Sequence, residues 1–321
     1  MNSLLELQMM KRMMIFSAIF LFFNVVVLNA EEPKSLVERL GYDKNAKLLI
    51  INADDFGMCH SANMGTFKGF EAGGLSSATI MTTCPWFKEA AFWIKEHPQY
   101  DVGVHTVLTS EWNAYKWGPV LGWTVPSLCT PEGYFPKDVM EMYAQGDMEE
   151  VEQEIRAQVD RALNAGIDVT HIDSHMGTMQ LEPKYLTVYA NIAKEYNVPC
   201  RMPSRDEIEK LYRMGKFYDE LFPNQGIVCP DELLRGSAPK VSETEAFWKE
   251  RLSNLKPGKV TEIFIHCADD SPEMKAMSSS QGIRYAETEF FSNPKTIKWL
   301  KDQGITVISY RKLRDLQRNE Q

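Results

Sequence analysis

The sequence lacks the short motifs that identify nucleotide-binding and redox proteins. No G-x-G-x-x-G follows the first strand-like run and no G-x-x-x-x-G-K-[ST] occurs, so neither a dinucleotide site nor a P-loop is indicated. The six cysteines include no C-x-x-C pair, which argues against a zinc ribbon and against a thioredoxin-like motif. Internal repeats and low-complexity tracts are also missing. The chemistry of this chain must therefore lie in other residue types.

An excess of positive charge is missing as well. The formal net charge is −9, which argues against nucleic acid or an anionic membrane surface as the main partner. With 321 residues, 44% of them hydrophobic and 25% charged, the chain is long and apolar enough to form an ample core. The length and composition predict a globular protein with room for one large α/β domain or two small ones, and they do not exclude a neutral substrate.

The long hydrophobic run of the sequence lies near the N-terminus. Lys11 and Arg12 precede an apolar stretch over residues 13–28, which ends in Leu-Asn-Ala before Glu31. A basic start, an apolar centre and a small residue at the end predict a signal peptide over residues 1–30, cleaved after Ala30. The run is short for a membrane span, which disfavours an uncleaved anchor. We therefore expect an exported protein, periplasmic or secreted, whose mature residues 31–321 form a single domain without stable membrane insertion.

All six cysteines lie in the expected mature chain. Export permits disulfides, but the spacing of the cysteines does not reveal a pairing, so scattered buried thiols are the default expectation.

Strand-like and helix-like patterns alternate along the rest of the chain. The strand-like runs cover residues 48–52, 77–81, 101–108, 168–172, 198–202, 262–266 and 306–309. Helical patterns lie between them, at residues 61–69, 86–95, 147–165, 183–196, 243–255 and 294–303. Such alternation favours parallel βα units, and about seven units favour a (β/α) barrel, incomplete or distorted, over an open sheet.

Two stretches interrupt this alternation, at residues 110–136 and 204–238. The first is rich in Trp, Pro and Gly and directly follows a strand-like run, the position of a lid or substrate wall in a barrel. Its aromatic side chains could stack on sugar rings or could simply pack the loop down, and the sequence leaves both open. The candidates for substrate binding are Trp112 and Trp117.

The first strand-like run ends in Asp54-Asp55-Phe56-Gly57. Two adjacent carboxylates at the lip of a parallel sheet repel each other, and a divalent metal would offset that repulsion with one acid as ligand and the other free as a base. The alternative is a helix N-cap, in which a carboxylate accepts hydrogen bonds from the first backbone N–H groups.

Four of the six histidines favour the metal. His105 and His266 end strand-like runs, and His171, Asp173 and His175 alternate along a third, so these side chains meet at one rim of a parallel barrel. Histidines that converge with paired carboxylates fit a His/His/Asp divalent metal site better than isolated structural histidines. His97 is expected at the surface, and His60 is left undecided.

Four segments, in this order, resemble the motifs of the YdjC-like carbohydrate deacetylases, the family of chitooligosaccharide-type enzymes. They are Asn-Ala-Asp-Asp-Phe-Gly at residues 52–57, Gly-Val-His followed by Leu-Thr at 103–109, Thr-His-Ile-Asp-Ser-His at 170–175, and Ile-His at 265–266. The similarity spans about residues 47 to 312. It implies a (β/α) barrel of the glycoside hydrolase/deacetylase type, removal of an N-acetyl group from an amino sugar or oligosaccharide, and one divalent metal held by Asp55, His105 and His175.

The expected roles of the remaining residues follow from that site. Metal-activated water would attack the acetamide, Asp54 would take its proton as general base, and His266 would protonate the leaving amine. His171 and Asp173 would orient the metal ligands. Arg284 would pair with a carboxylate near the site and contact substrate, or lie at the surface. Two imidazoles and one carboxylate favour Zn²⁺ over Mg²⁺ as the ion.

Two rival functions remain open from the sequence. One is a metal-dependent hydrolase of another amide, an ester or a phosphoester; the other is a non-catalytic carbohydrate-binding protein on the same fold. The presence of both Asp54 and His266 disfavours the second. The identity of the sugar and a homodimeric state are not decided.

Overall fold

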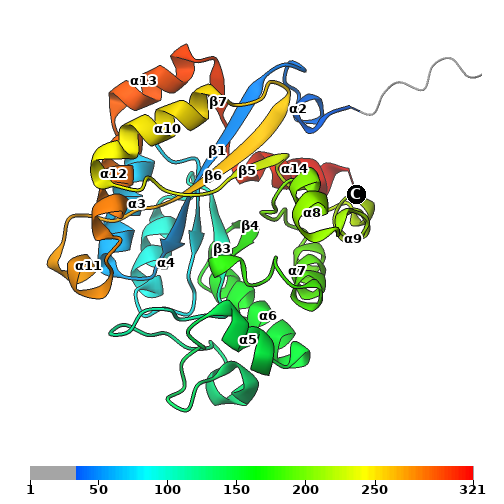
Figure 1. The fold of residues 1–321 in the computed structure, drawn as a ribbon, viewed down its shortest axis with the longest axis vertical. Helices are drawn as coiled ribbons and strands as arrows, with labels where there is room; N and C mark the ends of the chain where they lie inside the picture. The colour runs from blue at the N-terminus through cyan, green and yellow to red at the C-terminus, as the bar shows by residue number, and fades with distance from the viewer. Residues whose placement is uncertain (1–33, 321) are drawn as a thin grey trace, which may run out of the picture. The chain divides into compact units, whose positions relative to one another are not determined.

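The computed structural model describes residues 34–320, so the predicted signal peptide at residues 1–30 lies outside the described residues. The described part contains one seven-stranded parallel sheet, curled into a half-barrel and flanked by helices (Figure 1). Within residues 34–320, no helix combines the length and the hydrophobicity needed to cross a membrane.

The strands pair in the order β4-β3-β2-β1-β6-β5, and β7 pairs with the beginning of β1. Every pair is parallel, which places the carboxyl ends of the strands at one rim. The prediction of an incomplete (β/α) barrel is confirmed. The bounds of the strands are β1 (Lys47–Phe56), β2 (Ser77–Ile80), β3 (Val102–Thr106), β4 (Val169–Ser174), β5 (Glu232–Leu234), β6 (Lys259–His266) and β7 (Ile305–Val307).

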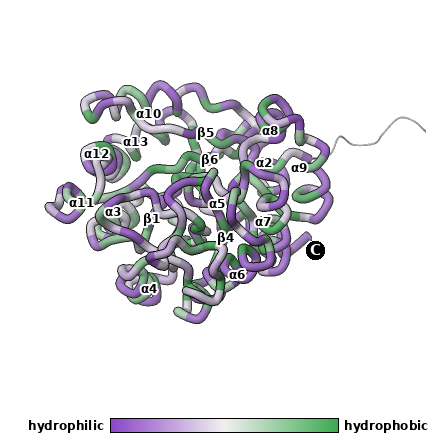
Figure 2. Tube along the Cα trace, turned by 60° about the horizontal axis from the view of Figure 1, so that its bottom comes forward, coloured by the Kyte–Doolittle hydropathy of each residue, from purple (hydrophilic) through white to green (hydrophobic). Residues whose placement is uncertain are grey.

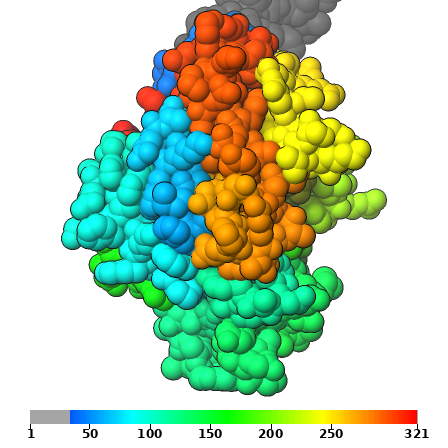
Figure 3. Space-filling view, turned by 90° about the vertical axis from the view of Figure 1, so that its left-hand side faces the viewer, coloured from blue at the N-terminus to red at the C-terminus, as the bar shows by residue number. Residues whose placement is uncertain are grey.

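Helices surround the strands, and hydrophobic and hydrophilic residues alternate along them, as Figure 2 shows. In Figure 3, α11 and α12 (orange) lie between α3 (blue) and α10 (yellow). The helices are α2 (Leu36–Arg39), α3 (His60–Glu71), α4 (Phe87–Glu96), α5 (Val139–Gln145), α6 (Met148–Asn164), α7 (Pro183–Glu195), α8 (Arg205–Tyr212), α9 (Gly215–Leu221), α10 (Thr244–Ser253), α11 (Pro272–Met277), α12 (Gln281–Phe291), α13 (Pro294–Asp302) and α14 (Tyr310–Asn319). Short 3₁₀ turns are η1 (Gly122–Thr124), η2 (Pro126–Leu128), η3 (His175–Gly177), η4 (Pro223–Gln225) and η5 (Val241–Glu243).

Two predicted elements were wrong. Residues 198–202 form no strand; this segment makes one isolated bridge, from Cys200 to Ile172 in β4. Pro199 and Pro203 lack the N–H groups that a longer ladder needs. Residues 204–238, expected to be irregular, contain α8, α9 and β5. The sequence pattern also did not predict α12 and α14.

The side chains of β1 explain how its carboxyl end becomes polar. Leu48 and Ile50 lie on the concave side and pack with Tyr310 in a small apolar cluster that closes the base of the half-barrel. Because side chains alternate along a strand, Asn52 and Asp54 continue on this same side toward the rim. The odd-numbered residues of β1 face the main core, between the sheet and its helices.

Asp55 departs from this alternation. Its φ of 63° is left-handed, and the pairing of β1 with β2 shifts register between Ala53 and Phe56. Aspartate tolerates this conformation better than most residues, and such a bulge re-aims side chains at the end of a strand. Two consecutive carboxylates therefore both reach the interior. The N-cap of α3 is Cys59, so the alternative reading of Asp54-Asp55 as a helix cap does not apply.

Candidate metal and active site

The strand register brings the predicted site residues together at the rim. Asp54 at the end of β1 pairs with His266 at the end of β6, and His105 in β3 pairs with Asp173 in β4. Residues at the same level of neighbouring parallel strands point to the same side of the sheet. The site therefore consists of side chains supplied from widely separated parts of the sequence.

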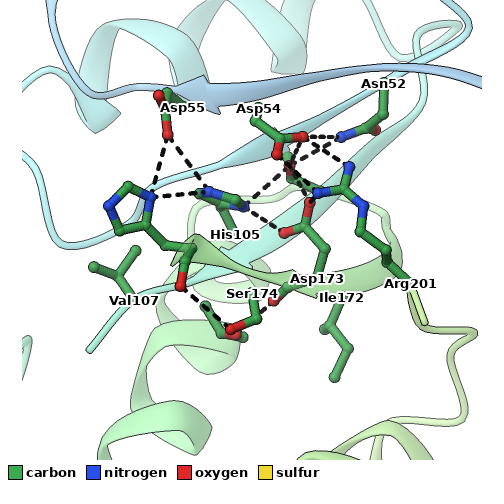
Figure 4. A network of polar contacts seen from close by, with 12 residues as sticks. Asn52, Asp54, Asp55, His105, Val107, Ile172, Asp173, Ser174 and Arg201 are labelled. Atoms are coloured by element: carbon green, nitrogen blue, oxygen red, sulfur yellow. Dashed lines mark hydrogen bonds and ion pairs between the residues drawn. The ribbon is translucent and has the colours of Figure 1, made fainter. Parts of the chain in front are cut away.

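Asp55, His105 and His175 form a buried triangle of possible metal ligands. Figure 4 shows Asp55 and His105 of this triangle beside Asp54, Asp173 and Arg201. Asp55 Oδ1 lies 3.4 Å from His105 Nε2 and 3.5 Å from His175 Nδ1, and the two nitrogens are 3.3 Å apart. Ligands about 2.1 Å from a tetrahedral ion would lie about 3.4 Å apart. Among the described residues, Asp55 Oδ1 also has no hydrogen-bond partner. Both observations fit a divalent ion bound by these three residues.

The other ring nitrogen of each histidine contacts a carboxylate. His105 Nδ1 lies 2.5 Å from Asp173 Oδ1, and His175 Nε2 lies 2.9 Å from Glu111 Oε2. Carboxylates in this position fix the orientation of an imidazole and increase its basicity as a metal ligand. Asp173 was predicted for this role, whereas Glu111, from the Trp-rich loop, was not.

These carboxylates also change the protonation of the two histidines in the absence of an ion. Burial opposes the charged imidazolium, but Asp173 and Asp55 outweigh it and raise the pKa of His105 to about 10. Burial likewise opposes the charge on His175, and Glu111 and Asp55 raise its pKa to about 9. A bound cation would take the place of these protons, so binding an ion should release protons.

Arg201 joins the carboxylates behind the triangle. Its NH1 and NH2 groups donate to the two oxygens of Asp54 at 2.7 Å each, so the pair is bidentate. NH1 also lies 2.8 Å from Asp173 Oδ2, and Nε donates to Glu262 Oε1 at 2.7 Å. All four side chains are at most 4% exposed. Arg201 thus compensates three buried acids at once.

Asp54 is held as a fixed, ionised carboxylate. Burial alone would raise its pKa, but Arg201 outweighs burial and lowers the pKa to about 2. Asn52 Nδ2 donates to Oδ1 at 2.9 Å, whereas the hydrogen bond to Oδ2 comes from Arg201. A carboxylate oxygen can accept two hydrogen bonds, so Oδ2 can accept a further hydrogen bond from a donor in the cavity.

His266 and Arg284 lie in the wall of the same cavity. Burial and the charge of Arg284 lower the pKa of His266 to about 4, so its imidazole is neutral near pH 7. Arg284 shows the carboxylate pairing expected of it, since NH2 donates to Asp55 Oδ2 at 2.7 Å. Its NH1 group is buried without a hydrogen-bond partner among the described residues. The cation of Arg284 therefore lines the cavity and retains an unpaired donor beside it.

His171 lies deeper than the other predicted residues. Its ring stacks on Tyr310 with centroids 3.7 Å apart, and Nε2 lies 3.2 Å from Asn52 Oδ1. Burial and Arg201 hold its pKa well below the ordinary value. Within residues 34–320, His171 makes no hydrogen bond to the three candidate ligands; it is connected to the site through Asn52, which donates to Asp54, and through Tyr310, which donates to Glu262.

The cavity above these groups has a volume of about 360 Å³. Its wall carries charged residues described above together with the apolar side chains of Met176, Leu181, Pro203, Leu233 and Phe264. Neither Trp112 nor Trp117 belongs to this wall. Trp117 is 2% exposed and packs its ring 5.9 Å from that of His175, and Trp112 lies 5.6 Å from the guanidinium of Arg284. In this structure both rings therefore support residues of the site from behind.

Arg201, Glu111 and Glu262 are the polar site residues that the sequence interpretation missed. Two of them had a usable signal: Arg201 and Glu262 are charged residues within otherwise apolar, strand-like runs. A charge in such a run is seldom buried unless it is paired. Glu111 follows the strand end in a long loop, and no pattern connects it with His175.

Comparison with known proteins agrees with this architecture. The model of the YdjC-like protein family matches residues 48–302. A carbohydrate deacetylase from Brevibacillus brevis is 30% identical over 83% of this chain and 99% of the relative, and one from Geobacillus stearothermophilus is 28% identical over 82% and 96%. Among solved structures, one from Enterococcus faecalis, described as a cellobiose-phosphate cleavage protein, has a TM-score of 0.71 and 28% identity and covers 84% of this chain and 99% of its own.

The fold and the site define the class: an incomplete (β/α) barrel with a buried Asp/His/His cluster at the carboxyl ends of its strands. Within that class, the chain belongs to the YdjC-like family.

Proposed function

We propose that this protein is a carbohydrate deacetylase that removes the acetyl group from an N-acetylated amino sugar or oligosaccharide with the help of one divalent metal ion. Family membership and relatives named as carbohydrate deacetylases support the reaction. The observation that carries the proposal is the buried triangle of Asp55, His105 and His175, which opens into a cavity of about 360 Å³.

The ion would be held by Asp55 Oδ1, His105 Nε2 and His175 Nδ1. When bound, a divalent ion supplies Lewis-acid polarisation and makes a water molecule nucleophilic near neutral pH. Two nitrogens and one oxygen suit Zn²⁺ best, with Mg²⁺ as the alternative. The second possible group, Asp54, His105 and Asp173, is less suited, because Arg201 already binds both of its carboxylates.

Asp54 acts as the general base in this proposal. Arg201 keeps the carboxylate ionised and fixed, and the free acceptor site on Oδ2 takes the proton of the attacking water. The low pKa keeps the Asp54 carboxylate unprotonated before the reaction begins. Arg201 therefore positions the base and does not itself take part in proton transfer.

His266 and Arg284 act on the substrate side. Arg284 NH1, which lacks a partner, donates to the acetyl oxygen as negative charge develops there. His266 starts neutral, and the growing negative charge in front of it favours its protonation. His266 takes up this proton from solvent and gives it to the nitrogen of the leaving amine, while Asp54 returns the proton of the water to solvent, so the products are the free amino sugar and acetate.

The apolar part of the cavity wall suits the substrate class. Phe264, Leu233 and Met176 would contact the acetyl methyl group and the C–H face of a sugar ring, while the charged part binds the amide. We also propose that the protein acts after export, on sugars outside the cytoplasm, because residues 1–30 have the pattern of a cleaved signal peptide.

The test is acetate and free-amine release from a panel of N-acetylated mono- and oligosaccharides, with and without a chelator. We expect chelator-sensitive release that returns when Zn²⁺ or Mg²⁺ is added. Asp54→Asn should keep the bound metal and lose at least about 100-fold in turnover, whereas His105→Ala should lose both. Asp302→Asn, which changes an exposed ion pair with Lys298, is the matched control and should keep both the bound metal and the turnover of the wild type.

Two outcomes would contradict the proposal. Full activity of Asp54→Asn would show that Asp54 is not the base. No release from any sugar by metal-loaded protein would favour one of the rivals, and assays with phosphoesters and thermal shifts with unreactive sugars would then separate another hydrolase from a binding protein.

A further inference from the structure

Two cysteines outside the active-site cavity lie in direct contact. The Sγ atoms of Cys200 and Cys229 are 3.7 Å apart, and both residues carry free thiols in this structure. The other four cysteines, Cys59, Cys84, Cys129 and Cys267, make no Sγ–Sγ contact within the described residues; where they form hydrogen bonds, the partners are backbone or hydroxyl groups. The default expectation of scattered thiols therefore holds for four cysteines and not for this pair.

The backbone brings the pair together, so the contact does not depend on flexible side chains. Cys200 N donates to the carbonyl of Val228, the residue before Cys229, at 3.3 Å. Cys200 is also bridged to Ile172 in β4, and Val228 N donates to Gln317 Oε1 of α14 at 2.8 Å. Both segments are anchored to the barrel. A rotation of the two side chains is all that bond formation requires, because a disulfide joins residues whose backbones already lie side by side.

The chain between the two cysteines leaves the barrel and returns. Residues 201–228 carry α8, α9 and η4, in a stretch that the sequence pattern indicated as an insert but that was expected to be irregular. A bond between Cys200 and Cys229 would close this excursion at its base. A covalent link across a loop of roughly 30 residues restricts the unfolded chain and stabilises the folded one.

We propose that Cys200 and Cys229 are a disulfide-forming pair, oxidised by thiol–disulfide exchange with an external disulfide. Cys229 is half-buried and within reach of a reagent, whereas Cys200 is fully buried. The Cys229 thiolate attacks the external disulfide, forms a mixed disulfide and releases one thiolate. The Cys200 thiolate then attacks Cys229 Sγ, forms the internal bond and releases the second thiolate. The two protons lost by the cysteines go to the two released thiolates, and the external disulfide is the species reduced.

The position of the pair links it to the site. Cys200 immediately precedes Arg201, whose backbone N–H donates to Ile172 at 3.1 Å and whose guanidinium joins Asp54, Asp173 and Glu262. The disulfide would hold this backbone in place from the side away from the cavity. The inference does not depend on the deacetylase activity, since it rests on the contact of the two thiols.

The experiment compares the purified chain after incubation with reduced or with oxidised glutathione. Free thiols are counted in denaturant, and the linked peptides are identified by mass spectrometry. We expect the count to fall from six to four in the wild type, with a peptide that joins Cys200 to Cys229. The thermal midpoint should be about 5–10 °C higher in the oxidised form.

Variants separate this pair from the other thiols. Cys229→Ser and Cys200→Ala should each keep all five of their thiols and show no oxidation-dependent change in thermal midpoint. Cys129→Ser is the matched control and should still lose two. Six thiols remaining in the folded, oxidised wild type, a bond to any other cysteine, or a stable glutathione adduct on Cys229 would each overturn the proposal.

Discussion

Removal of the Arg201 guanidinium should be among the most damaging single changes in this protein. Arg201→Ala leaves Asp54, Asp173 and Glu262 buried without their shared cation. Breaking a buried ion pair by removing one partner costs about 3–5 kcal/mol. For a protein of this size that corresponds to a fall of about 6–20 °C in thermal midpoint.

Arg205→Ala is the matched control. Arg205 also forms a two-oxygen pair, with Asp219, but the two side chains are 46% and 37% exposed. Exposed pairs contribute about 0–1 kcal/mol, so the control should lose less than about 4 °C. Both variants and the wild type are compared by thermal unfolding after removal of metal with a chelator, so that loss of an ion cannot account for a difference.

The pH dependence provides a second check on the same reasoning. Burial already raises the pKa of Glu262 to about 7, even though Arg201 partly offsets it. Without Arg201, the buried carboxyls of Asp54 and Glu262 should have folded-state pKa values above their unfolded values, so the variant loses stability as pH rises through that range. The deficit should therefore be larger at pH 8 than at pH 5. A deficit no larger than that of Arg205→Ala, or one that grows toward pH 5, would refute the argument.

Two further predictions follow from buried carboxylates. Glu111→Gln should weaken divalent-metal binding about 10- to 100-fold, because Glu111 orients His175. Titration with Zn²⁺ measures the affinity, and Glu132→Gln, at an exposed residue of the same loop, is the control. Equal affinities in the two variants would count against this role of Glu111. Glu154 is fully buried in α6 and accepts the N–H groups of Val120 and Leu121, and burial raises its pKa to about 7. Relative to an unfolded pKa near 4.3, this acid contributes about 3 kcal/mol to the free energy of unfolding. The contribution is present below the unfolded pKa and is lost as pH rises toward 7. From pH 4.5 to pH 8, the thermal midpoint should therefore fall less in Glu154→Gln than in the wild type. Glu149→Gln, on the same helix, is the control and should behave like the wild type. The same fall in all three proteins would show that Glu154 does not titrate in this range.

The sequence predicted the rim of the barrel well, because several strand-like runs end in, or just before, aspartate or histidine residues. Asp54, His105 and His266 lie where the strand ends should converge, and the parallel sheet brings them together. The sequence pattern placed both Asp54 and Asp55 at the rim, but it did not predict the left-handed residue at a bulge that lets both side chains face inward. A strict alternation would have turned one of the two acids away from the cavity.

Contacts between distant segments account for the rest of what the sequence left unresolved. Arg201 lies in a run that was interpreted as an ordinary strand, and its three acidic partners come from β1, β4 and β6. Glu111 reaches His175 from a loop without periodicity. Helices α8 and α9 are short, and α8 is polar on most of its surface with one buried residue, Ile208, so hydrophobic spacing gave a weak signal there.

The position of β1 in the sheet has a consequence for the order in which the chain can fold. One side of β1 pairs with β2, which follows soon after it in the sequence. The other side pairs with β6, and the start of β1 pairs with β7; both of these strands lie near the C-terminal end of the chain. Until most of the chain has been made, the apolar residues 48–51 present an open strand edge, and such edges promote association between chains. An exported chain would face this exposure twice, during synthesis and after translocation. The late pairing of β1 with β6 then covers one edge of β1 and brings Asp54 beside His266 in the same step.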